Sequence, residues 1–324
     1  MRRLSRFTFA IAAIAAVSAS AAMAQSYPDR PIRLVVGYPP GGAVDIIART
    51  IGQALTERLG HNIIVDNRPG SAANLAAEVV KNAKPDGYTL LHGPDNLFVI
   101  NPHIYSRMPV DPIKDFVPVT SMIRNQLVLT VNPSKVPVND FRGFIDFAKK
   151  AKEPLFYASI GNGSVHHLAT EYLKRTAGIN LIHVPYKGGG PAGIATVSGE
   201  AAVMFGGGSV VPLAKSGKLK AIAVSSTKRS KELPDLPTIS EFYPDYAVTI
   251  WHGLFAPVGT PQPILDKLRT EVATVLARPD VQARLAKSGS GEPYVVPPAE
   301  FAAHIRRDYD TYGKLIKEIG LKVD

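Results

Sequence analysis

The chain contains no cysteine among its 324 residues. Disulfide bonds, a catalytic thiol and cysteine-ligated metal sites are therefore excluded, and the fold must be stabilised by burial alone. Tryptophan is almost absent as well, since Trp251 is the only one. We expect this residue either in the core at a hinge or in one wall of a ligand cleft.

Several motifs of known enzyme classes are also missing. The chain has no H-E-x-x-H zinc motif, and it has no G-x-S-x-G nucleophile turn, because no glycine stands two residues before Ser159. His166 and His167 are adjacent, so on a helix they point about 100° apart, which is poor geometry for a single metal ion. We expect no cofactor and no metal.

One enzymatic alternative stays open, because histidine is the commonest general acid or base. An envelope hydrolase could use a histidine among His92, His166 and His252. The missing nucleophile arrangement disfavours this alternative, and incubation with candidate esters would test it.

Long apolar runs are confined to the N-terminus. Arg2, Arg3 and Arg6 precede an apolar stretch at 7–17 and an A-x-A site at 22–24, which predicts a secretory signal cleaved after Ala24. No later run approaches the roughly 20 residues of a membrane helix. The mature chain is therefore expected to be exported and soluble.

The excess of positive charge is small. The formal net charge is +10, and removal of the three signal arginines leaves +7. Lysine and arginine are scattered and are not interleaved with aromatic residues, so a nucleic-acid groove is not expected. A mild positive field instead favours anionic solutes.

Strands and helices alternate along most of the chain. The predicted strands are 32–36, 62–66, 88–91, 127–132, 155–158, 181–184, 201–205, 219–224 and 250–257. The predicted helices are 43–59, 72–81, 141–151, 164–176, 191–198, 263–276, 281–288 and 298–319. Residues 101–118 and 235–246 are rich in proline and lack a clear period. Short loops between alternating elements predict an α/β fold with parallel sheets and covering helices.

The mature chain is long enough for two domains. We place the crossings between them just before residue 127 and at residue 250. Lobe I would comprise 25–125 plus 250–324, and lobe II would comprise 126–249. Two crossings predict a hinge between two α/β lobes, with a ligand cleft between them.

Four glycine-rich turns follow predicted strands, at 38–42, 159–164, 186–190 and 205–209. A helix that begins after such a turn directs unpaired N–H groups and the positive end of its dipole outward, which suits an anion. Ser164 is a candidate N-cap. A single Gly-Gly would be an ordinary turn, but four such turns divided between two lobes favour a cleft for a small carboxylate.

A set of short motifs runs through the whole mature chain. They are YPDRPIRLVV (27–36), PPGG (39–42) with Asp45 and Arg49, DNRPG (66–70), PDGY (85–88), NP (101–102), SIGNGSVHHL (159–168), HVPYKG (183–188), LPT (236–238) and APVGTP (256–261). With these motifs the chain resembles a solute receptor of the tripartite tricarboxylate transporters, often called the Bug family.

The resemblance implies a periplasmic binding protein with two lobes, similar to the type II class, that closes on a ligand and passes it to a membrane permease. It implies a non-enzymatic receptor, expected as a monomer that does not bind nucleic acid. A sensor-accessory protein with the same ligands but a kinase partner remains an alternative. The resemblance also implies that the turns at 38–42 and 159–164 hold a carboxylate, largely with main-chain amides and waters.

The candidate ligand-binding residues lie on the glycine-rich turns and on two nearby strands. They are Tyr38, Pro40, Gly41, Gly42, Ala43, His92, Ser159, Asn162, Gly163, Ser164, Tyr186, Gly206, Gly207 and His252. No catalytic residue is assigned.

The ligand is predicted to be a mono- or dicarboxylate without an amino group, including one with an aromatic ring or a longer chain. An ammonium group needs acceptors, because a buried unpaired charge costs several kcal/mol. Gly206 and Gly207 offer none where the family often has an Asp-Asn pair. Asp45 and Asp95 are the reservation, since either could face the cleft and accept from an ammonium group.

Overall fold

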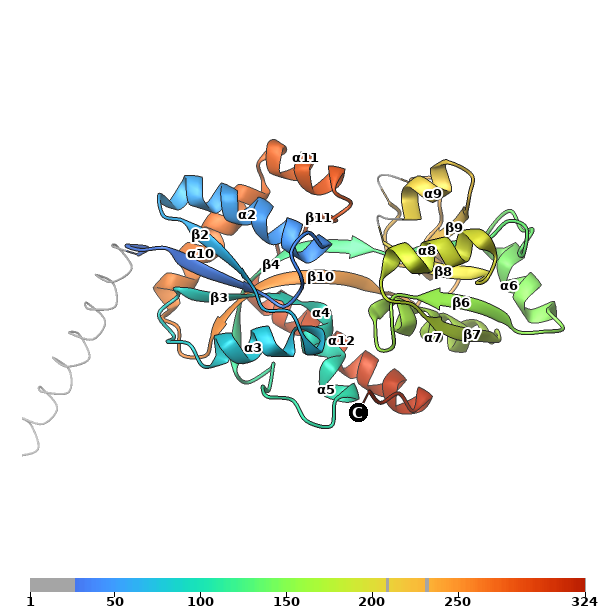
Figure 1. The fold of residues 1–324 in the computed structure, drawn as a ribbon, viewed down its shortest axis with the longest axis horizontal. Coiled ribbons are helices and arrows are strands. Elements are labelled where there is room, and N and C mark those ends of the chain that lie inside the picture. The colour runs from blue at the N-terminus through green and yellow to red at the C-terminus, as the bar shows by residue number, and fades with distance from the viewer. Residues whose placement is uncertain (1–26, 208–209, 231–232, 324) are drawn as a thin grey trace, which may run out of the picture.

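Two β-sheets, each covered by helices, form the two halves of the molecule in a computed structural model of the chain (Figure 1). The structure describes residues 27–207, 210–230 and 233–323. The predicted signal peptide, residues 1–24, lies outside the described residues. None of the helices within the described ranges is long and apolar enough to cross a membrane.

The six-stranded sheet has the strand order β11-β4-β10-β3-β1-β2. Its strands are β1 (Ile32–Val36), β2 (Ile63–Asn67), β3 (Thr89–Pro94), β4 (Phe116–Gln126), β10 (Thr249–Pro257) and β11 (Glu292–Pro293). β1 pairs in parallel with β2 and β3, whereas β10 runs antiparallel to β3 and β4. This sheet and its helices are called lobe I below.

The five-stranded sheet has the strand order β7-β6-β8-β5-β9. Its strands are β5 (Val128–Val131), β6 (Leu155–Ser159), β7 (Leu181–Pro185), β8 (Val203–Gly206) and β9 (Lys220–Val224). β6 is parallel to β7 and β8, and β5 is antiparallel to β8 and β9. This half is called lobe II. The fold is the expected α/β fold with two lobes, whereas the exact lobe boundaries stay a prediction.

The helices cover the faces of the sheets (Figure 1). Lobe I carries α2 (Ala43–Leu59), η1 (Ser71–Ala73), α3 (Asn74–Lys81), α4 (Asp95–Val99), α5 (Asn101–Ile104), α10 (Gln262–Leu276), α11 (Pro279–Lys287) and α12 (Pro298–Ile319). Lobe II carries α6 (Phe141–Lys150), α7 (Val165–Ala177), α8 (Gly189–Ser198), α9 (Val211–Lys215) and η3 (Ile239–Glu241). Every predicted strand and helix is present, with ends displaced by a few residues.

The sequence prediction was wrong for the region before β5. Residues 101–118 are not irregular throughout, because they contain α5 and the start of β4. β4 went unrecognised because Pro118 and a polar stretch interrupt its pattern. Pro118 lies opposite Phe255, next to a shift in the β4–β10 register, where the missing amide of a proline is tolerated.

The strand predicted at 88–91 is longer than expected, because β3 continues through Pro94 and α4 begins at Asp95. Gly93 permits this continuation. A Cβ atom at Gly93 would lie 2.6 Å from ring carbons of both Phe98 and Phe255, so only glycine fits between these stacked rings. His92 is consequently part of a buried strand.

The two chain crossings between the lobes lie side by side and are joined through the main chain and the hydroxyl group of Ser225. The Ser225 Oγ accepts from the Leu127 amide at 2.9 Å and donates to the Val248 carbonyl at 2.6 Å. Leu127 follows β4, and Val248 precedes β10. Ser225 is fully buried. This bond therefore ties lobe II to both strands that enter lobe I.

Helix α12 forms a third connection, since it contacts α4, α5 and β4 of lobe I and also α7 of lobe II (Figure 1). Arg175 of α7 pairs with Glu318 of α12. One hydrophobic cluster includes side chains of both lobes, such as Leu168 of α7 and Ile316 of α12. The lobes thus share a packed side along α12.

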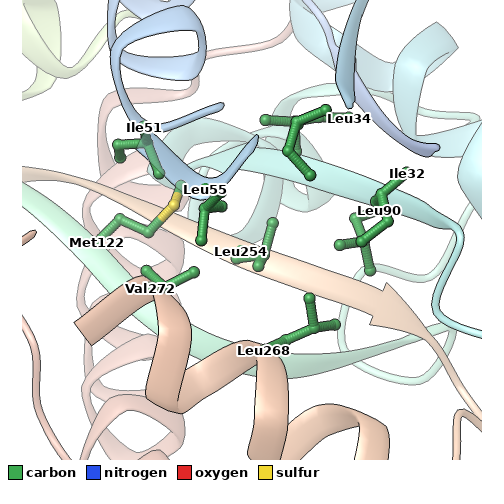
Figure 2. A pocket seen from close by; sticks show the side chains of 10 residues that line it. Ile32, Leu34, Ile51, Leu55, Leu90, Met122, Leu254, Leu268 and Val272 are labelled. Carbon is green, nitrogen blue, oxygen red and sulfur yellow. The ribbon is translucent and has the colours of Figure 1, made fainter. Parts of the chain in front are cut away.

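The core of lobe I contains a small apolar gap. A gap of about 10 Å³ remains between α2, α10 and the sheet (Figure 2). Only apolar side chains line it, including Leu55, Met122 and Leu268. This volume is about that of one water molecule, and the lining offers it no polar partner, so the gap belongs to the core.

Trp251 belongs to the core at the hinge. Its side chain is fully buried, and its Nε1 donates to Asp308 Oδ2 of α12 at 2.9 Å. Of the two placements that the sequence left open, the structure selects the core.

Ser225→Ala should destabilise the protein by roughly 1–3 kcal/mol, because it leaves a buried amide and a buried carbonyl without their partner. Urea unfolding at neutral pH measures the loss. The matched control is Ser216→Ala, since the exposed Ser216 donates only to Leu213 within its own turn. Equal unfolding free energies for the two variants would contradict the role of Ser225.

Gly163→Ala should cost more stability than Gly41→Ala. Both glycines have positive φ, at 71° and 82°, so alanine is strained at each by about 1 kcal/mol. Only at Gly163 would the new Cβ meet another atom closely, at 2.7 Å from Ile104 Cδ1 of lobe I, whereas Gly41 faces open space. Thermal unfolding of the two variants tests this difference, and an equal fall in Tm would contradict the contact between the lobes.

Candidate functional site

A cavity of about 980 Å³ lies between the lobes. Lobe I contributes the turn after β1, the β3–α4 junction, the hinge end of β10 and the segment after α11. Lobe II contributes the turn before α7, the start of α8 and helix α9. Cavities of this size and position are typical of small-molecule sites.

Half of the predicted ligand-binding residues line this cavity. They are Tyr38, Ala43, Asn162, Gly163, Ser164, Gly207 and His252. They come from both lobes and from the hinge strand β10, so the fold brings together residues that are far apart in the sequence. Their role in binding stays a prediction.

The other predicted residues do not line the cavity. They are Pro40, Gly41, Gly42, His92, Ser159, Tyr186 and Gly206. Pro40, Gly41 and Gly42 lie in the exposed turn at the start of α2. His92 is fully buried in β3, behind His252, with the two rings 5.1 Å apart.

Three of these residues have structural partners of their own. Ser159 is fully buried and its Oγ lies 2.6 Å from His183 Nε2. The Tyr186 hydroxyl donates to Glu200 at 2.8 Å. A Cβ at Gly206 would lie 2.2 Å from Val210 Cγ1, so this glycine serves close packing at the end of β8.

The start of α2 is less open to an anion than its sequence indicates. No side chain caps this helix at Gly42, but the Gly41 amide donates to Asp45 Oδ2 at 2.9 Å. Arg49 and Asn67 also donate to Asp45. Burial alone would raise the pKa of Asp45, but these hydrogen bonds hold it below its usual value. The protein's own carboxylate thus occupies this turn, and Asp45 does not line the cavity.

The start of α7 is the better anion site. Ser164 is the predicted N-cap, and its Oγ accepts from the His167 amide at 3.2 Å. No acidic residue lies in the first turn, so the positive end of the helix dipole is not neutralised there. The residues from Ile160 to His166 all line the cavity.

A stacked pair of histidines, of which His167 is buried, holds the turn before α7 in place. The Gly163 amide donates to His167 Nδ1 at 3.2 Å, and the His167 ring stacks on His183 at 3.8 Å. Burial, together with His183, lowers the pKa of His167 to about 4, so the ring is neutral at pH 7 and accepts at Nδ1. The Gly163 amide is therefore already engaged and is not free for a ligand.

The lobe I wall is built from a chain of side-chain amides. Tyr38 donates to Asn96 at 3.0 Å, and Asn96 donates to the Ala72 carbonyl at 3.0 Å. Asn101 also donates to this carbonyl, at 2.9 Å. The backbone from Ser71 to Ala73 has positive φ at all three residues. The amides fix this unusual backbone, which the sequence did not reveal.

Three side chains of the cavity lining each carry a buried polar atom without a hydrogen-bond partner in the described part of the chain. They are Asp95 Oδ2, His166 Nδ1 and His252 Nδ1, each unpaired within the described part of the chain. Burial lowers the pKa of His166 and of His252 to about 4, so both rings are neutral at pH 7. Burial raises the pKa of Asp95 to about 8, against the hydrogen bond from the Asn96 amide. Unpaired buried groups are costly, and a bound ligand can satisfy them.

Two lysines lie at the edge of the cavity and were missed from the sequence. Lys215 ends α9 of lobe II, and Lys287 ends α11 of lobe I. Both are exposed. Each lysine is the last residue of its helix and belongs to no recognisable motif. The sequence therefore did not indicate that either lies at a binding cavity. They put positive charge on opposite lobes.

The arrangement expected of a serine hydrolase is not present at the cavity. Ser159 Oγ lies within hydrogen-bond distance of the His183 ring, but both residues are outside the cavity lining. Ser164 lines the cavity, but it donates to the Gly161 carbonyl at 2.7 Å and caps α7. No group of three or more metal-binding side chains occurs in the described ranges.

Relatives of known sequence cover almost the whole chain. A UPF0065 protein of Bordetella bronchiseptica is 33% identical over 98% of this chain and 94% of its own length. A solved structure of an R. palustris protein with adipate is 32% identical, covers 91% of this chain and 99% of that one, and has a TM-score of 0.78. MatC from Rhodopseudomonas palustris with bound malate is 31% identical, covers 90% and 100%, and has a TM-score of 0.73.

The family model described as the tripartite tricarboxylate transporter family receptor matches residues 47–321. This span contains both sheets except β1 and all of the cavity lining except its first few residues. The members of this family are periplasmic solute-binding receptors rather than enzymes. The chain belongs to the tripartite tricarboxylate transporter receptor family, as its sequence motifs predicted.

Proposed function

We propose that this protein captures a small organic carboxylate without an ammonium group, in the cavity between its lobes, and delivers it to a permease of the tripartite tricarboxylate type. The observation that carries the proposal is the cavity itself, because the first turn of α7, which contains no acidic residue, lines it from lobe II. It works as an exported monomeric receptor in the periplasm, without a cofactor and without catalysis.

The anchor for one carboxylate is the first turn of α7. This helix is 13 residues long, so its dipole is well developed at the N-terminus. Ser164 satisfies the His167 amide. Val165 and His166, the first two residues of the helix, line the cavity, and amides at these positions have no acceptor within a helix. A carboxylate held at such a helix start needs no arginine.

The size and charge of the cavity favour a second acidic group. About 980 Å³ exceeds what a small acid fills, so a longer chain or a ring fits. Lys215 and Lys287 can attract a second negative charge from opposite lobes. The structural relatives with adipate and with malate support dicarboxylates as the ligand class.

The cavity offers little to an ammonium group. Asp95 is the one acidic side chain of its lining in the described chain, and its raised pKa of about 8 keeps it mostly neutral at pH 7. Gly207 contributes no side chain. An α-amino acid would therefore bury a cation with no ready counter-charge.

Thermal-shift measurements on the mature protein test the ligand class. The panel contains adipate, malate, a monocarboxylate with an aromatic ring, citrate, aspartate and glutamate. A ligand at a hundredfold excess over its Kd stabilises by about 2.7 kcal/mol, which gives a clear rise in Tm. Adipate or another non-amino carboxylate should give the largest rise. A larger rise with aspartate or glutamate than with every non-amino acid would refute the proposed class.

Lys215→Ala and Lys287→Ala should each weaken a dicarboxylate about fivefold, the equivalent of roughly 1 kcal/mol for a partly exposed ion pair. A monocarboxylate of similar length should lose less, because it has no second charge. Isothermal titration at low salt measures both, with the exposed Lys150→Ala in α6 as the control. An equal loss of affinity for the dicarboxylate and the monocarboxylate would show that the lysines do not bind a second carboxylate.

A further inference from the structure

Two stacked histidines lie behind the turn at 159–164, outside the cavity lining. The ring centroids of His167 and His183 are 3.8 Å apart, and the ring planes are inclined by only 10°. Each ring reaches one end of the turn. His167 Nδ1 accepts from the Gly163 amide at 3.2 Å, and His183 Nε2 lies 2.6 Å from Ser159 Oγ. The pair therefore fastens the turn at both ends.

The hydrogen bonds of this turn divide its amides into two groups. Four amides donate to the turn itself or to α7, and they are those of Gly161, Gly163, Ser164 and His167. The other three amides between 161 and 167 have no acceptor among the residues that the structure describes, and they are those of Asn162, Val165 and His166. All three of these residues line the cavity. The amide that His167 engages thus lies between amides that remain free.

The backbone of the turn needs such a support. Gly161 and Gly163 have φ of 134° and 71°, and glycine exchanges readily between such conformations and others when nothing holds it. A site made of main-chain amides loses affinity when the backbone moves, because hydrogen bonds weaken steeply with distance and angle. The support at Gly163 has to be an acceptor, because the group that it holds is an N–H.

We propose that His167, stacked on His183, is a positioning residue for ligand binding, because its Nδ1 holds the Gly163 amide and so keeps the neighbouring free amides in the geometry that binds a carboxylate. The proposal rests on the proposed function and names the residue that prepares the first turn of α7 from behind. His167 does not contact the ligand. It restricts the turn before binding, and a site that is ordered in advance binds more tightly.

Two substitutions of His167 separate its hydrogen bond from its packing. His167→Asn keeps an acceptor, since the amide Oδ1 takes the place of Nδ1, but it removes the ring. His167→Phe keeps a ring that can stack on His183, but it has no acceptor. Calorimetry with adipate at pH 7 should give His167→Asn an affinity within about twofold of the wild type, and His167→Phe an affinity about tenfold lower. The control is His61→Phe, before β2 and outside the cavity lining, which should bind as the wild type does.

Thermal unfolding of the same variants distinguishes positioning from a purely structural role. His167→Asn loses buried ring surface and should have the lower Tm of the two variants, yet it should bind adipate more tightly. A purely structural role predicts that affinity follows Tm, so that His167→Phe binds more tightly than His167→Asn. Opposite orders of Tm and affinity are therefore the expected result.

Nitrogen-15 NMR of the ligand-free wild type, labelled at histidine, tests the hydrogen bond without relying on the stability of a variant. The ring signals show which nitrogen carries the proton, and His167→Asn assigns the His167 signals by their loss. We expect an unprotonated Nδ1 and a protonated Nε2 at pH 7. A proton on Nδ1 would overturn the inference, because the Gly163 amide would then face another donor.

The outcomes separate the two proposals. Failure of both adipate and malate to bind the wild type would refute the proposed function, and the positioning role with it. Binding of adipate by the wild type, together with equal affinities of His167→Asn and His167→Phe or with tighter binding by His167→Phe, would overturn the role of His167 alone.

Discussion

The antiparallel pairing of β4 with β10 is the constraint on which the rest of the structure depends. The two strands run together from Phe116 and Pro257 to Gln126 and Thr249, and both chain crossings begin where this pairing ends. The register places Ile250 and His252 of β10 and Asn125 of β4 at the floor of the cavity. A shift of one residue would turn these side chains to the opposite face of the sheet. The positions of the cavity and of the hinge therefore both depend on the register of β4 against β10.

The lobes are joined on one side and separated on the other. Helix α12 packs against α7 across the boundary. Gly163 of lobe II faces Ile104 of lobe I, and both residues also line the cavity between the lobes. Because packed interfaces resist deformation, motion of the lobes is expected about the Ser225 bridge and along α12. The cavity keeps several buried polar atoms unpaired, at a cost that the apolar cores of both lobes offset.

Much of the fold could be predicted from the sequence, because its helices are long and amphipathic and its strands are apolar. The glycine-rich turns also located Asn162, Gly163 and Ser164 at the cavity, because a glycine turn before a helix has a direct structural cause. β4 could not be predicted, because Pro118 interrupts its apolar pattern. The register shift against β10 that allows a proline at this position is visible only in the structure. α4 and α5 are too short to show a helical period.

The site was harder to predict than the fold, because sequence shows residue types but not their partners. The glycine-rich turn predicts that the Gly41 amide is free to bind a ligand. In the structure this amide donates to Asp45 in the first turn of α2 instead. His92 and His252 look alike in sequence, and the strand register places them on the same face of the sheet with their rings 5.1 Å apart, but only His252 reaches the cavity. Lys215 and Lys287 come to one cavity only through the packing of two lobes.

The central claim is that a carboxylate binds between the lobes and contacts both of them. A crystal structure of the mature protein with adipate tests it most directly. The account predicts one carboxylate at the first turn of α7 of lobe II and the rest of the ligand in contact with the lobe I residues that line the cavity. Adipate bound outside this cavity, or bound to one lobe only, would contradict the account.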